Sequence, residues 1–402
     1  MANQFASISS AVALLKNWYQ GPIVSQFSDE LPLYREMERG KQKYNGLAVI
    51  RPVKVRRNPG IGATSDGGTL PAIGQQTTVQ ATINAKFNYL RFGITGPMIK
   101  ASQGDKGAFV SAMEFEMSEG LTDLKNDVNR QLFYNGVGTI ATVAAAAVNS
   151  NSITASGRSS GEPGNKYLDV GMVIDIVTTA GVKVASGIGI TAISGTTTVT
   201  LTLSANVSCS ATDLIVRSGA YNNEVEGLLA ALDGGTGSIY GINRTTYPIY
   251  QGNAVSAGGG QLTLNLMQQA YNEARRRGNG KPNAVFCDFD SERFYNKLLV
   301  ADKRYVGKVA GDGTFSSKDG SYLEFAGVPV TPDKDCGQAF FFIDAKYMEK
   351  FVLAELEWAD ETGSYLIAQT SADAFEARLR MFFNVFNAKP SASSVLSSYI
   401  AP

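Results

Sequence analysis

The sequence of 402 residues predicts an α+β protein, and three patterns carry this prediction. From Thr77 to Tyr89 polar and apolar residues alternate, which is typical of a strand with one buried face. Between Asp105 and Tyr134 apolar residues recur every three or four positions, which indicates a long amphipathic helix. From Thr139 to Arg217 short runs of Thr, Ser, Val, Ile and Ala are separated by Gly or Ser, which predicts a small inserted all-β module.

The N-terminal part of the chain is predicted to be an arm with one short helix. Ile8, Val12 and Leu15 define an apolar stripe from Ala6 to Trp18, and Gly21-Pro22 ends it. The chain is then irregular to about Asn45. Residues 35–57 are locally basic in a neutral protein, because only Glu36 and Glu38 oppose a series of cations: Arg35, Arg39, Lys41, Lys43, Arg51, Lys54, Arg56 and Arg57.

A projecting hairpin is predicted next. Residues 47–57 are strand-like, with Pro52 indicating an edge, and they pair with the strand that starts at Thr77. Arms of this length project about 35 to 50 Å. An isolated two-stranded ribbon is marginal in water, so its apolar face must lie on another part of the chain or on a neighbouring copy. That face is Val79, Ala81, Ile83, Ala85, Phe87 and Tyr89.

The glycine-rich stretch that joins the two strands, RNPGIGATSDGGTLPAIGQQ, is not a phosphate-binding loop. The dinucleotide fingerprint needs a third glycine and a following helix, whereas Gly60-Ile-Gly62 leads to Ser65 and then to a strand. A triphosphate loop needs a lysine, and residues 58–85 contain none. We expect the glycines to give the tip of the ribbon flexibility.

The long helix is about 45 Å long and ends at Gly136 and Gly138. Its polar face is mainly acidic, with only Lys125 and Arg130 as cations: Glu114, Glu116, Glu119, Asp123 and Asp127. A basic ribbon and an acidic helix in one chain of zero net charge predict that one copy docks on another. The predicted inter-subunit contact residues are therefore these five carboxylates together with Arg51, Lys54, Arg56 and Arg57.

The remaining elements follow from shorter patterns. The inserted module has candidate strands at 166–177, 182–190 and 196–203, few charges and no site-like cluster. Residues 220–233 are predicted to be helical. An α/β segment follows, with Thr263 as the N-cap of a helix and Gly278 just past its end. Further elements are a strand at 284–288, a helix at 291–299, strands near 325–330 and 340–344, and a long strand at 375–385.

The composition argues against an enzyme. The chain has no histidine, which removes the commonest general base and metal ligand. Cys209, Cys287 and Cys336 are too widely spaced for a disulfide framework or a Cys-x-x-Cys metal site, and they favour synthesis in a reducing cytoplasm. Equal numbers of acidic and basic residues, 36 each, argue against a dedicated nucleic-acid binder. No catalytic, cofactor or metal residue is predicted.

The local charge pairs have structural interpretations. Asp288 with Asp290 is predicted to be a helix N-cap before Ser291, and Asp333 with Asp335 and Asp360 with Glu361 are predicted to be solvated turns. The run from Arg275 to Arg277 falls in the last turn of a helix, where cations complement the macrodipole. No apolar run approaches the roughly 18 residues that span a bilayer, and no cleavable leader is recognisable, so neither export nor membrane insertion is expected.

The order of these parts resembles the major capsid protein of tailed bacteriophages, which has the Hong Kong 97-type fold. The resemblance covers essentially the whole chain. It is strongest in four stretches: KYLDVGMVIDI, NNEVEGLLAALD, KPNAVFCDFDSERFYNKLLVADKRYV and RLRMFFNVFNAKPSA. It implies an N-terminal arm at 1–45, an E-loop hairpin at 46–96, a peripheral (P) domain at 97–138 and 346–402, an inserted β-rich domain at 139–219, and an axial (A) domain at 220–345.

The resemblance also implies a function. Hexamers and pentamers of this chain would form an icosahedral shell, the virion capsid, assembled in the host bacterial cytoplasm, with E-loop and N-arm overlapping neighbouring subunits. The implied partners are copies of the chain itself, a scaffolding protein, a portal, a decoration protein and packaged double-stranded DNA, which is touched non-specifically. Some members cross-link their subunits through an E-loop lysine, which is missing between Asn58 and Ala85, so no covalent link is expected here.

Some members begin with a long helical scaffolding segment, and none precedes the arm here, so a separate scaffolding protein is expected. An encapsulin-type bacterial compartment, which has the same fold and encloses an enzyme, is the alternative. An α/β hydrolase-like or nucleotide-binding enzyme is the third hypothesis.

Overall fold

The computed structural model describes residues 31–95, 106–159, 161–303, 323–359, 367–368 and 373–402. The helix predicted from Ala6 to Trp18 lies outside these residues. The chain divides into two compact units. The first comprises Met1–Val49, Ile83–Leu132 and Glu349–Phe386, and the second comprises Ile50–Thr82, Phe133–Met348 and Asn387–Pro402.

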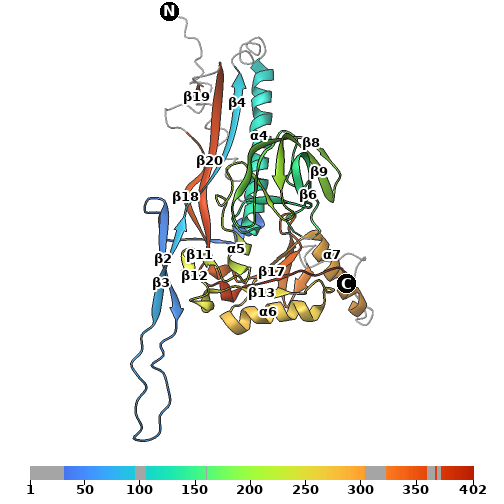
Figure 1. Ribbon diagram of the computed structural model, residues 1–402. Coiled ribbons are helices and arrows are strands. Elements are labelled where there is room, and N and C mark those ends of the chain that lie inside the picture. The colour runs from blue at the N-terminus through green and yellow to red at the C-terminus, as the bar shows by residue number, and fades with distance from the viewer. Residues whose placement is uncertain (1–30, 96–105, 160, 304–322, 360–366, 369–372) are drawn as a thin grey trace, which may run out of the picture. The chain divides into compact units, whose positions relative to one another are not determined.

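The first unit is built on a five-stranded sheet with a long helix packed on it (Figure 1). The strands are β1 (Glu38–Arg39), β18 (Met348–Trp358), β20 (Ala374–Asn387) and β19 (Ile367–Ala368), with β4 (Lys86–Thr95) paired to β20. The short helix α2 (Pro32–Glu36) precedes β1, and the long helix is α4 (Lys106–Phe133). The helix approaches β4 closely at Gly120, where a Cβ would lie 2.9 Å from the Leu90 side chain.

The predicted long helix and the predicted final strand are both confirmed. α4 runs from Lys106 to Phe133, and β20 covers the alternating segment, with Leu379, Met381 and Phe383 buried. β4 and β20 are antiparallel over ten paired residues, from Thr95 with Ala374 to Lys86 with Phe383. Strong periodicity over many residues predicts such elements well, because an error at one position leaves the pattern intact.

The predicted strand from Thr77 to Tyr89 is two strands, β3 (Thr77–Asn84) and β4, separated by Ala85. The Ala85 N–H donates to the carbonyl oxygen of Leu47 at 2.8 Å, outside both ladders. One inserted residue reverses which side chains face inward, because strand side chains alternate with a period of two. The prediction that Phe87 and Tyr89 continue the buried face is therefore wrong: they are 42% and 55% exposed, and Asn88 is buried.

The second unit contains a six-stranded mixed sheet in the order β13-β21-β17-β14-β16-β15. The strands are β13 (Asn253–Ser256), β14 (Ala284–Cys287), β15 (Leu323–Phe325), β16 (Val328–Pro332), β17 (Ala339–Ile343) and β21 (Ser394–Ser397). The helices α6 (Leu264–Gly278) and α7 (Phe289–Lys303) accompany this sheet. Its core joins Met267 and Ala270 of α6 to Tyr295 of α7 and to Phe340 and Phe342 of the fully buried β17.

The predicted caps of α6 are half right. The Thr263 side chain accepts the Leu266 N–H at 3.2 Å, so the N-cap is confirmed. Gly278, predicted to lie past the end, is the last helical residue, and the left-handed position belongs to Asn279 with φ of 48°. Gly278 is required for packing, because a Cβ there would overlap the backbone of Ser391.

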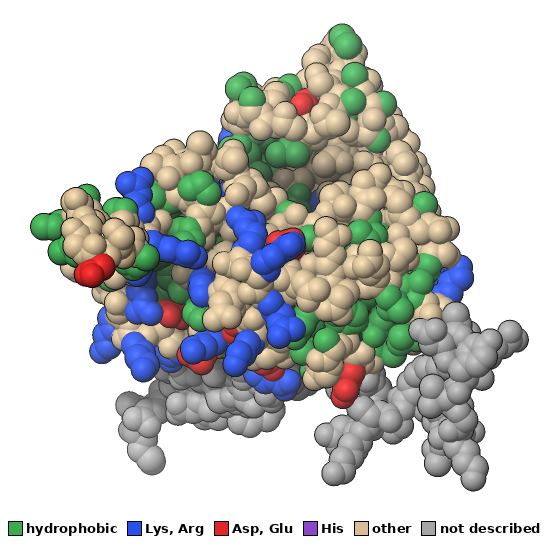
Figure 2. Space-filling model, turned by 90° about the horizontal axis from the view of Figure 1, so that it is seen from below, with side chains coloured by type: hydrophobic (Ala, Val, Ile, Leu, Met, Phe, Trp, Pro, Cys, Tyr) green, Lys and Arg blue, Asp and Glu red, His purple; other side chains and the backbone are tan. Residues whose placement is uncertain are grey.

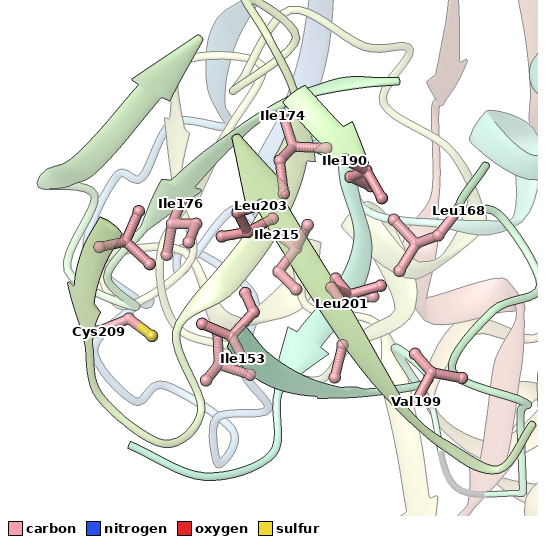
Figure 3. Close-up of a cluster of buried hydrophobic side chains, with 14 of the residues drawn as sticks. Ile153, Leu168, Ile174, Ile176, Ile190, Val199, Leu201, Leu203, Cys209 and Ile215 are labelled. Atoms are coloured by element: carbon pink, nitrogen blue, oxygen red, sulfur yellow. The ribbon is translucent and has the colours of Figure 1, made fainter. Parts of the chain in front are cut away.

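The inserted module is a closed barrel in the order β10-β5-β6-β9-β8-β7. Its strands are β5 (Thr139–Val143), β6 (Ala147–Ser156), β7 (Val173–Val177), β8 (Lys183–Ser194), β9 (Thr198–Cys209) and β10 (Leu214–Arg217). The all-β prediction is confirmed, although residues 166–172 form turns where a strand was expected. Figure 3 shows Ile153, Leu201 and Ile215 in the barrel's own core. Closure leaves no free strand edge.

The helix predicted at 220–233 is wrong for most of its length. Only α5 (Leu228–Leu232) is helical. Asn222 has a φ of 59°, and its N–H donates to the Val137 carbonyl oxygen at 3.0 Å. A hydrogen bond to a distant segment thus replaces the local bonds that a helix would make. Short elements complete the second unit: β11 (Ser238–Ile239), β12 (Ile242–Asn243), and the 3₁₀ turns η2 (Pro248–Tyr250), η3 (Ala345–Tyr347) and η4 (Pro390–Ala392).

Candidate interaction surface

The ribbon consists of β2 (Ala48–Arg56), β3 and the loop 57–76 that joins them. It extends at the lower left of Figure 1, where the loop continues well beyond the paired strands. The Thr82 N–H donates to the Tyr240 carbonyl oxygen at 2.8 Å, which joins β3 to the turn between β11 and β12. Within the loop, Gly68 closes a turn by donating its N–H to the Ser65 carbonyl oxygen at 2.9 Å.

Two glycines bring the arms of the loop together. A Cβ on Gly74 would lie 2.6 Å from the Gly60 nitrogen, which leaves no room for a side chain. The Gly60 N–H donates to Asn58 Oδ1 at 2.8 Å, so this arm also has a defined backbone path. Gly60 and Gly74 therefore permit a close backbone approach, a role different from the flexibility expected of this stretch.

Replacing Gly74 with alanine is expected to separate the two arms, because overpacked contacts of this kind cost about 1–3 kcal/mol. The cleavage rate within residues 57–76 should rise several-fold in limited proteolysis. Gln75→Ala, an exposed neighbour, is the control and should leave the rate unchanged. Equal cleavage of the Gly74→Ala variant and the unaltered chain would contradict the close approach.

The loop carries exposed apolar side chains. Ile61, Leu70 and Ile73 are 84%, 78% and 101% exposed, respectively. The loop that joins β2 to β3 thus leaves three large apolar side chains open to solvent.

A groove of about 440 Å³ lies beside β2, and we call it the basic groove. One wall comes from β2 and the residue after it: Arg51, Pro52, Val53, Lys54, Arg56 and Arg57. The other comes from η2, η3, η4 and the two residues before η4: Ile249, Tyr250, Tyr347, Ala388, Lys389 and Ser391. Five of these twelve residues are cationic and none is acidic. Figure 2 shows a face on which Lys and Arg side chains gather.

The second wall of the basic groove is held in place by hydrogen bonds and ring contacts. The Tyr250 hydroxyl donates to the Asn387 carbonyl oxygen at 2.7 Å, and burial raises its pKa, so it stays a neutral donor. The Ala388 N–H donates to the Tyr347 carbonyl oxygen at 2.9 Å. The Lys389 ammonium lies 5.2 Å from the centre of the Tyr347 ring, a distance at which a cation is attracted to the aromatic face.

The predicted basic contact residues differ in their surroundings. Lys54, Arg56 and Arg57 are exposed, and among the described residues none of them is paired with a carboxylate. Arg51 is half-buried.

The predicted acidic residues of α4 also divide into groups. Glu119 and Asp123 are exposed and one helical turn apart. Asp127 is engaged within its own helix, accepting hydrogen bonds from Arg130 at 3.0 Å and from Gln131 at 2.8 Å. Lys125 is only 3% exposed. Between 119 and 127, the exposed face of α4 thus presents two carboxylates and no cation, and we call Glu119 and Asp123 the acidic face. The side chains of Glu114 and Glu116 lie outside the described residues.

The inserted barrel carries an ionic cluster that no sequence pattern predicted. Arg158 donates to Glu162 Oε2 at 3.2 Å and to the Asp335 carbonyl oxygen at 2.8 Å. The Tyr167 hydroxyl donates to Asp335 Oδ1 at 2.9 Å, and Lys166 donates to Glu162 Oε1 at 2.8 Å. The Arg158 guanidinium also lies over the rings of Tyr134 and Tyr167, at 4.8 and 4.7 Å. We call Arg158, Glu162, Lys166, Tyr167 and Asp335 the latch cluster. It joins the barrel to the turn at 333–337.

The expectation of a solvated turn at Asp333 and Asp335 is wrong, since these residues are 7% and 2% exposed. Arg158 and Tyr167 contact the buried Asp335, and the Asp335 N–H donates to Asp333 Oδ1 at 2.8 Å. Burial by itself would raise the pKa of Glu162, but the charges of Arg158 and Lys166 lower it below its usual range. The lowered pKa keeps Glu162 ionised at neutral pH, where it pairs with Arg158 and Lys166, and this arrangement is structural.

The other charged candidates are structural as predicted. Asp288 Oδ1 accepts the Ser291 N–H at 3.1 Å and caps α7, and burial raises the Asp288 pKa. Arg275, Arg276 and Arg277 lie in the last turn of α6. Asp360 and Glu361 fall outside the described residues. Within the described part of the chain, no group of Cys, Asp and Glu residues is placed to hold a metal ion. No described helix is long and apolar enough to cross a membrane.

Comparison with solved structures identifies the architecture. A chain of the cyanophage A-1(L) capsid asymmetric unit matches with a TM-score of 0.55 at 15% identity, over 99% of this chain and 95% of that chain. Chains from the capsid of an empty GTA particle and from the holo-SrpI encapsulin complex of Synechococcus elongatus match with TM-scores of 0.47 and 0.43. Both are 8% identical, and the matches cover 92% and 93% of this chain and 90% of each of those chains. No protein-family model and no curated protein matches the sequence significantly. The chain has the fold of the cyanophage A-1(L) capsid chain.

Proposed function

We propose that this chain is the major capsid protein of a tailed double-stranded DNA bacteriophage, a structural protein without enzymatic activity. The observation that carries the proposal is the fold, which matches a cyanophage A-1(L) capsid chain over 99% of the residues. Hexamers and pentamers of the chain would form an icosahedral shell around the genome. Its place is then the virion, after assembly in the host bacterial cytoplasm.

The ribbon supports self-association on physical grounds. Its two strands form a separate two-stranded sheet, and the loop beyond them exposes Ile61, Leu70 and Ile73. A ribbon of this kind is marginal alone and gains stability when a partner covers its apolar side chains. In a closed assembly each copy offers a ribbon and receives one, so the same modest contact is repeated around the shell.

The partners beyond the chain itself follow from the same proposal. A scaffolding protein supplied by a separate chain would set the shell size, a portal would occupy one vertex, and a decoration protein would bind the finished surface. Packaged DNA would be touched non-specifically. Residues 58–85 contain no lysine, so the ribbon would hold its neighbour without a covalent bond from this loop.

Electron microscopy of the expressed protein tests the proposal. The unaltered chain should form curved shells or closed particles, and shells of uniform size should require a separate scaffolding protein. A variant with residues 59–74 replaced by a short Gly-Ser turn should remain folded by circular dichroism but stay unassembled.

The proposal would be wrong if the chain stayed monomeric at high concentration with and without the proteins it is produced beside. Closed particles that enclose an enzyme and no double-stranded DNA would instead identify an encapsulin-type compartment.

A further inference from the structure

We propose that the basic groove is the docking site for the acidic face of α4 on a second copy of this chain. Glu119 and Asp123 would enter between the β2 wall and the wall that carries Lys389. The inference rests on the proposed function, because it requires copies to associate, and it names the partner of this surface. It also adds Lys389 and Tyr347 to the contact, which the sequence patterns did not indicate.

The two surfaces are complementary in charge. The basic groove has five cationic lining residues and no acidic one, in a chain whose formal net charge is zero. The acidic face presents Glu119 and Asp123, and the nearest cation on that helix, Lys125, is 3% exposed. Each surface therefore has one sign of charge, and together they are neutralised without repulsion.

The charged groups of the two surfaces are also similarly spaced. Lys54 and Arg56 are alternate residues of β2, so their side chains emerge about 7 Å apart on one face of the strand. Glu119 and Asp123 are four residues apart in a helix, which puts their Cβ atoms about 6 Å apart. One helical face can therefore meet two cations of the strand at once, and Arg57 and Lys389 extend the contact at the rim.

The residues that line the basic groove favour a protein ligand over a nucleic acid. Sites for single-stranded nucleic acid combine cations with aromatic faces on which bases stack. In this groove neither tyrosine offers a free face for a base to stack on. Lys346 and Lys389 lie over the ring of Tyr347, and Tyr250 is 2% exposed. Between the cations the lining is apolar, with Pro52, Val53, Ile249 and Ala388. Such a lining suits the hydrocarbon stems of Glu and neighbouring helix residues.

Reciprocal charge reversal tests the docking. Arg56→Glu with Arg57→Glu, and separately Glu119→Lys with Asp123→Lys, should each lower shell yield at least about tenfold, because like charges then face one another. All four side chains are exposed, so each monomer should keep its circular dichroism spectrum. Combining the two pairs in one chain should restore shells. Arg277→Glu with Lys281→Glu makes the same charge change on an exposed surface elsewhere, and its yield should be unchanged.

A separate variant tests whether the second wall of the basic groove contributes to docking. Lys389→Glu should reduce shell yield, and Lys346→Glu, which also lies near the Tyr347 ring but does not line the groove, should reduce it less. Equal yields for Lys389→Glu and the unaltered chain would remove the second wall from the proposal.

Cross-linking shows whether the contact joins two copies. A chain carrying Arg57→Cys and Asp123→Cys should give a ladder of multimers with a short bis-maleimide, because Cys209, Cys287 and Cys336 are buried and give little background. Cross-linking confined to single chains would overturn the proposal.

These outcomes distinguish a failure of the proposed function from a failure of the docking. If the unaltered chain forms no shells either alone or with the proteins it is produced beside, the proposed function fails. If every charge variant assembles like the unaltered chain, or if the combined reversal does not restore shells, only the docking is overturned. Shells of the Arg56→Glu/Arg57→Glu variant that assemble normally but package less DNA would assign the groove to nucleic acid instead.

Discussion

Replacing Arg158 with methionine is expected to lower the free energy of unfolding of the second unit by about 3–5 kcal/mol, because it removes the more deeply buried of the two cations that face the Glu162 carboxylate. The Arg158 side chain is 2% exposed and that of Glu162 is 6% exposed. The substitution also removes the bond to the Asp335 carbonyl oxygen, which joins the barrel to the turn beside β16 and β17. Methionine keeps an unbranched apolar stem, so the loss reports on the charge more than on packing.

The measurement is denaturant unfolding, supported by hydrogen exchange at residues 333–337. Arg293→Met is the control, because Arg293 pairs with Asp290 at 2.9 Å on the surface, and exposed pairs contribute about 0–1 kcal/mol. A second variant, Arg158→Met with Glu162→Leu, removes both charges and should recover much of the loss. If Arg158→Met behaved like Arg293→Met, the latch cluster would not hold the turn.

The latch cluster could not be predicted from the sequence. Arg158, Glu162, Lys166 and Tyr167 are close in sequence, but their partner Asp335 is 168 residues beyond Tyr167. In the sequence, these four residues therefore look like a few scattered charges in a β module. Likewise, Asp333 and Asp335 have the composition of an exposed turn, and only the arrival of a distant segment makes them buried. Long-range polar contacts leave no periodic signal in the chain.

Periodic elements were predictable, and their interruptions were not. α4 and β20 extend over many residues, so their apolar stripes survive an occasional misfit. The reversal at Ala85 depends on one residue that leaves the ladder to bond Leu47, and nothing in the alternation from Val79 to Tyr89 marks it. In the candidate surface, the basic strand could be predicted from its composition. The second wall of the basic groove could not, because Tyr347 and Lys389 reach β2 only through the fold.

Asp175→Asn is expected to destabilise the barrel by about 2–4 kcal/mol, because hydrogen bonds to a charged acceptor are the stronger ones. Asp175 lies on β7 and is 0% exposed. Its carboxylate accepts the Gly187 N–H at 2.9 Å, the Gly219 N–H at 3.3 Å and the Lys183 ammonium at 2.9 Å. An asparagine has one acceptor oxygen, and its NH₂ group would face donors. Hydrogen exchange of the β7 and β8 amides measures the effect, and Asp169→Asn, an exposed aspartate in the same module, is the control.

The same carboxylate gives the barrel a defined acid sensitivity. Burial alone would raise the pKa of Asp175, but its backbone and lysine donors lower it to about 2 from an ordinary value of 3.8. A depressed carboxyl pKa stabilises the folded state above the unfolded pKa, and this stability is lost as the pH falls toward the folded value. The difference between the two pKa values corresponds to about 2 kcal/mol.

The stability gap between the unaltered chain and Asp175→Asn should therefore be constant at pH 5 to 7 and narrow between about pH 4 and pH 2. Comparing the two chains at each pH removes the contribution of the other carboxylates, which titrate equally in both. A gap that persisted at pH 2 would mean that the hydrogen-bond geometry, and not the charge, stabilises this part of the barrel. The pH dependence thus separates the contribution of the Asp175 charge from that of its hydrogen-bond geometry. A measurement of the Asp175→Asn variant at neutral pH alone would give only their sum.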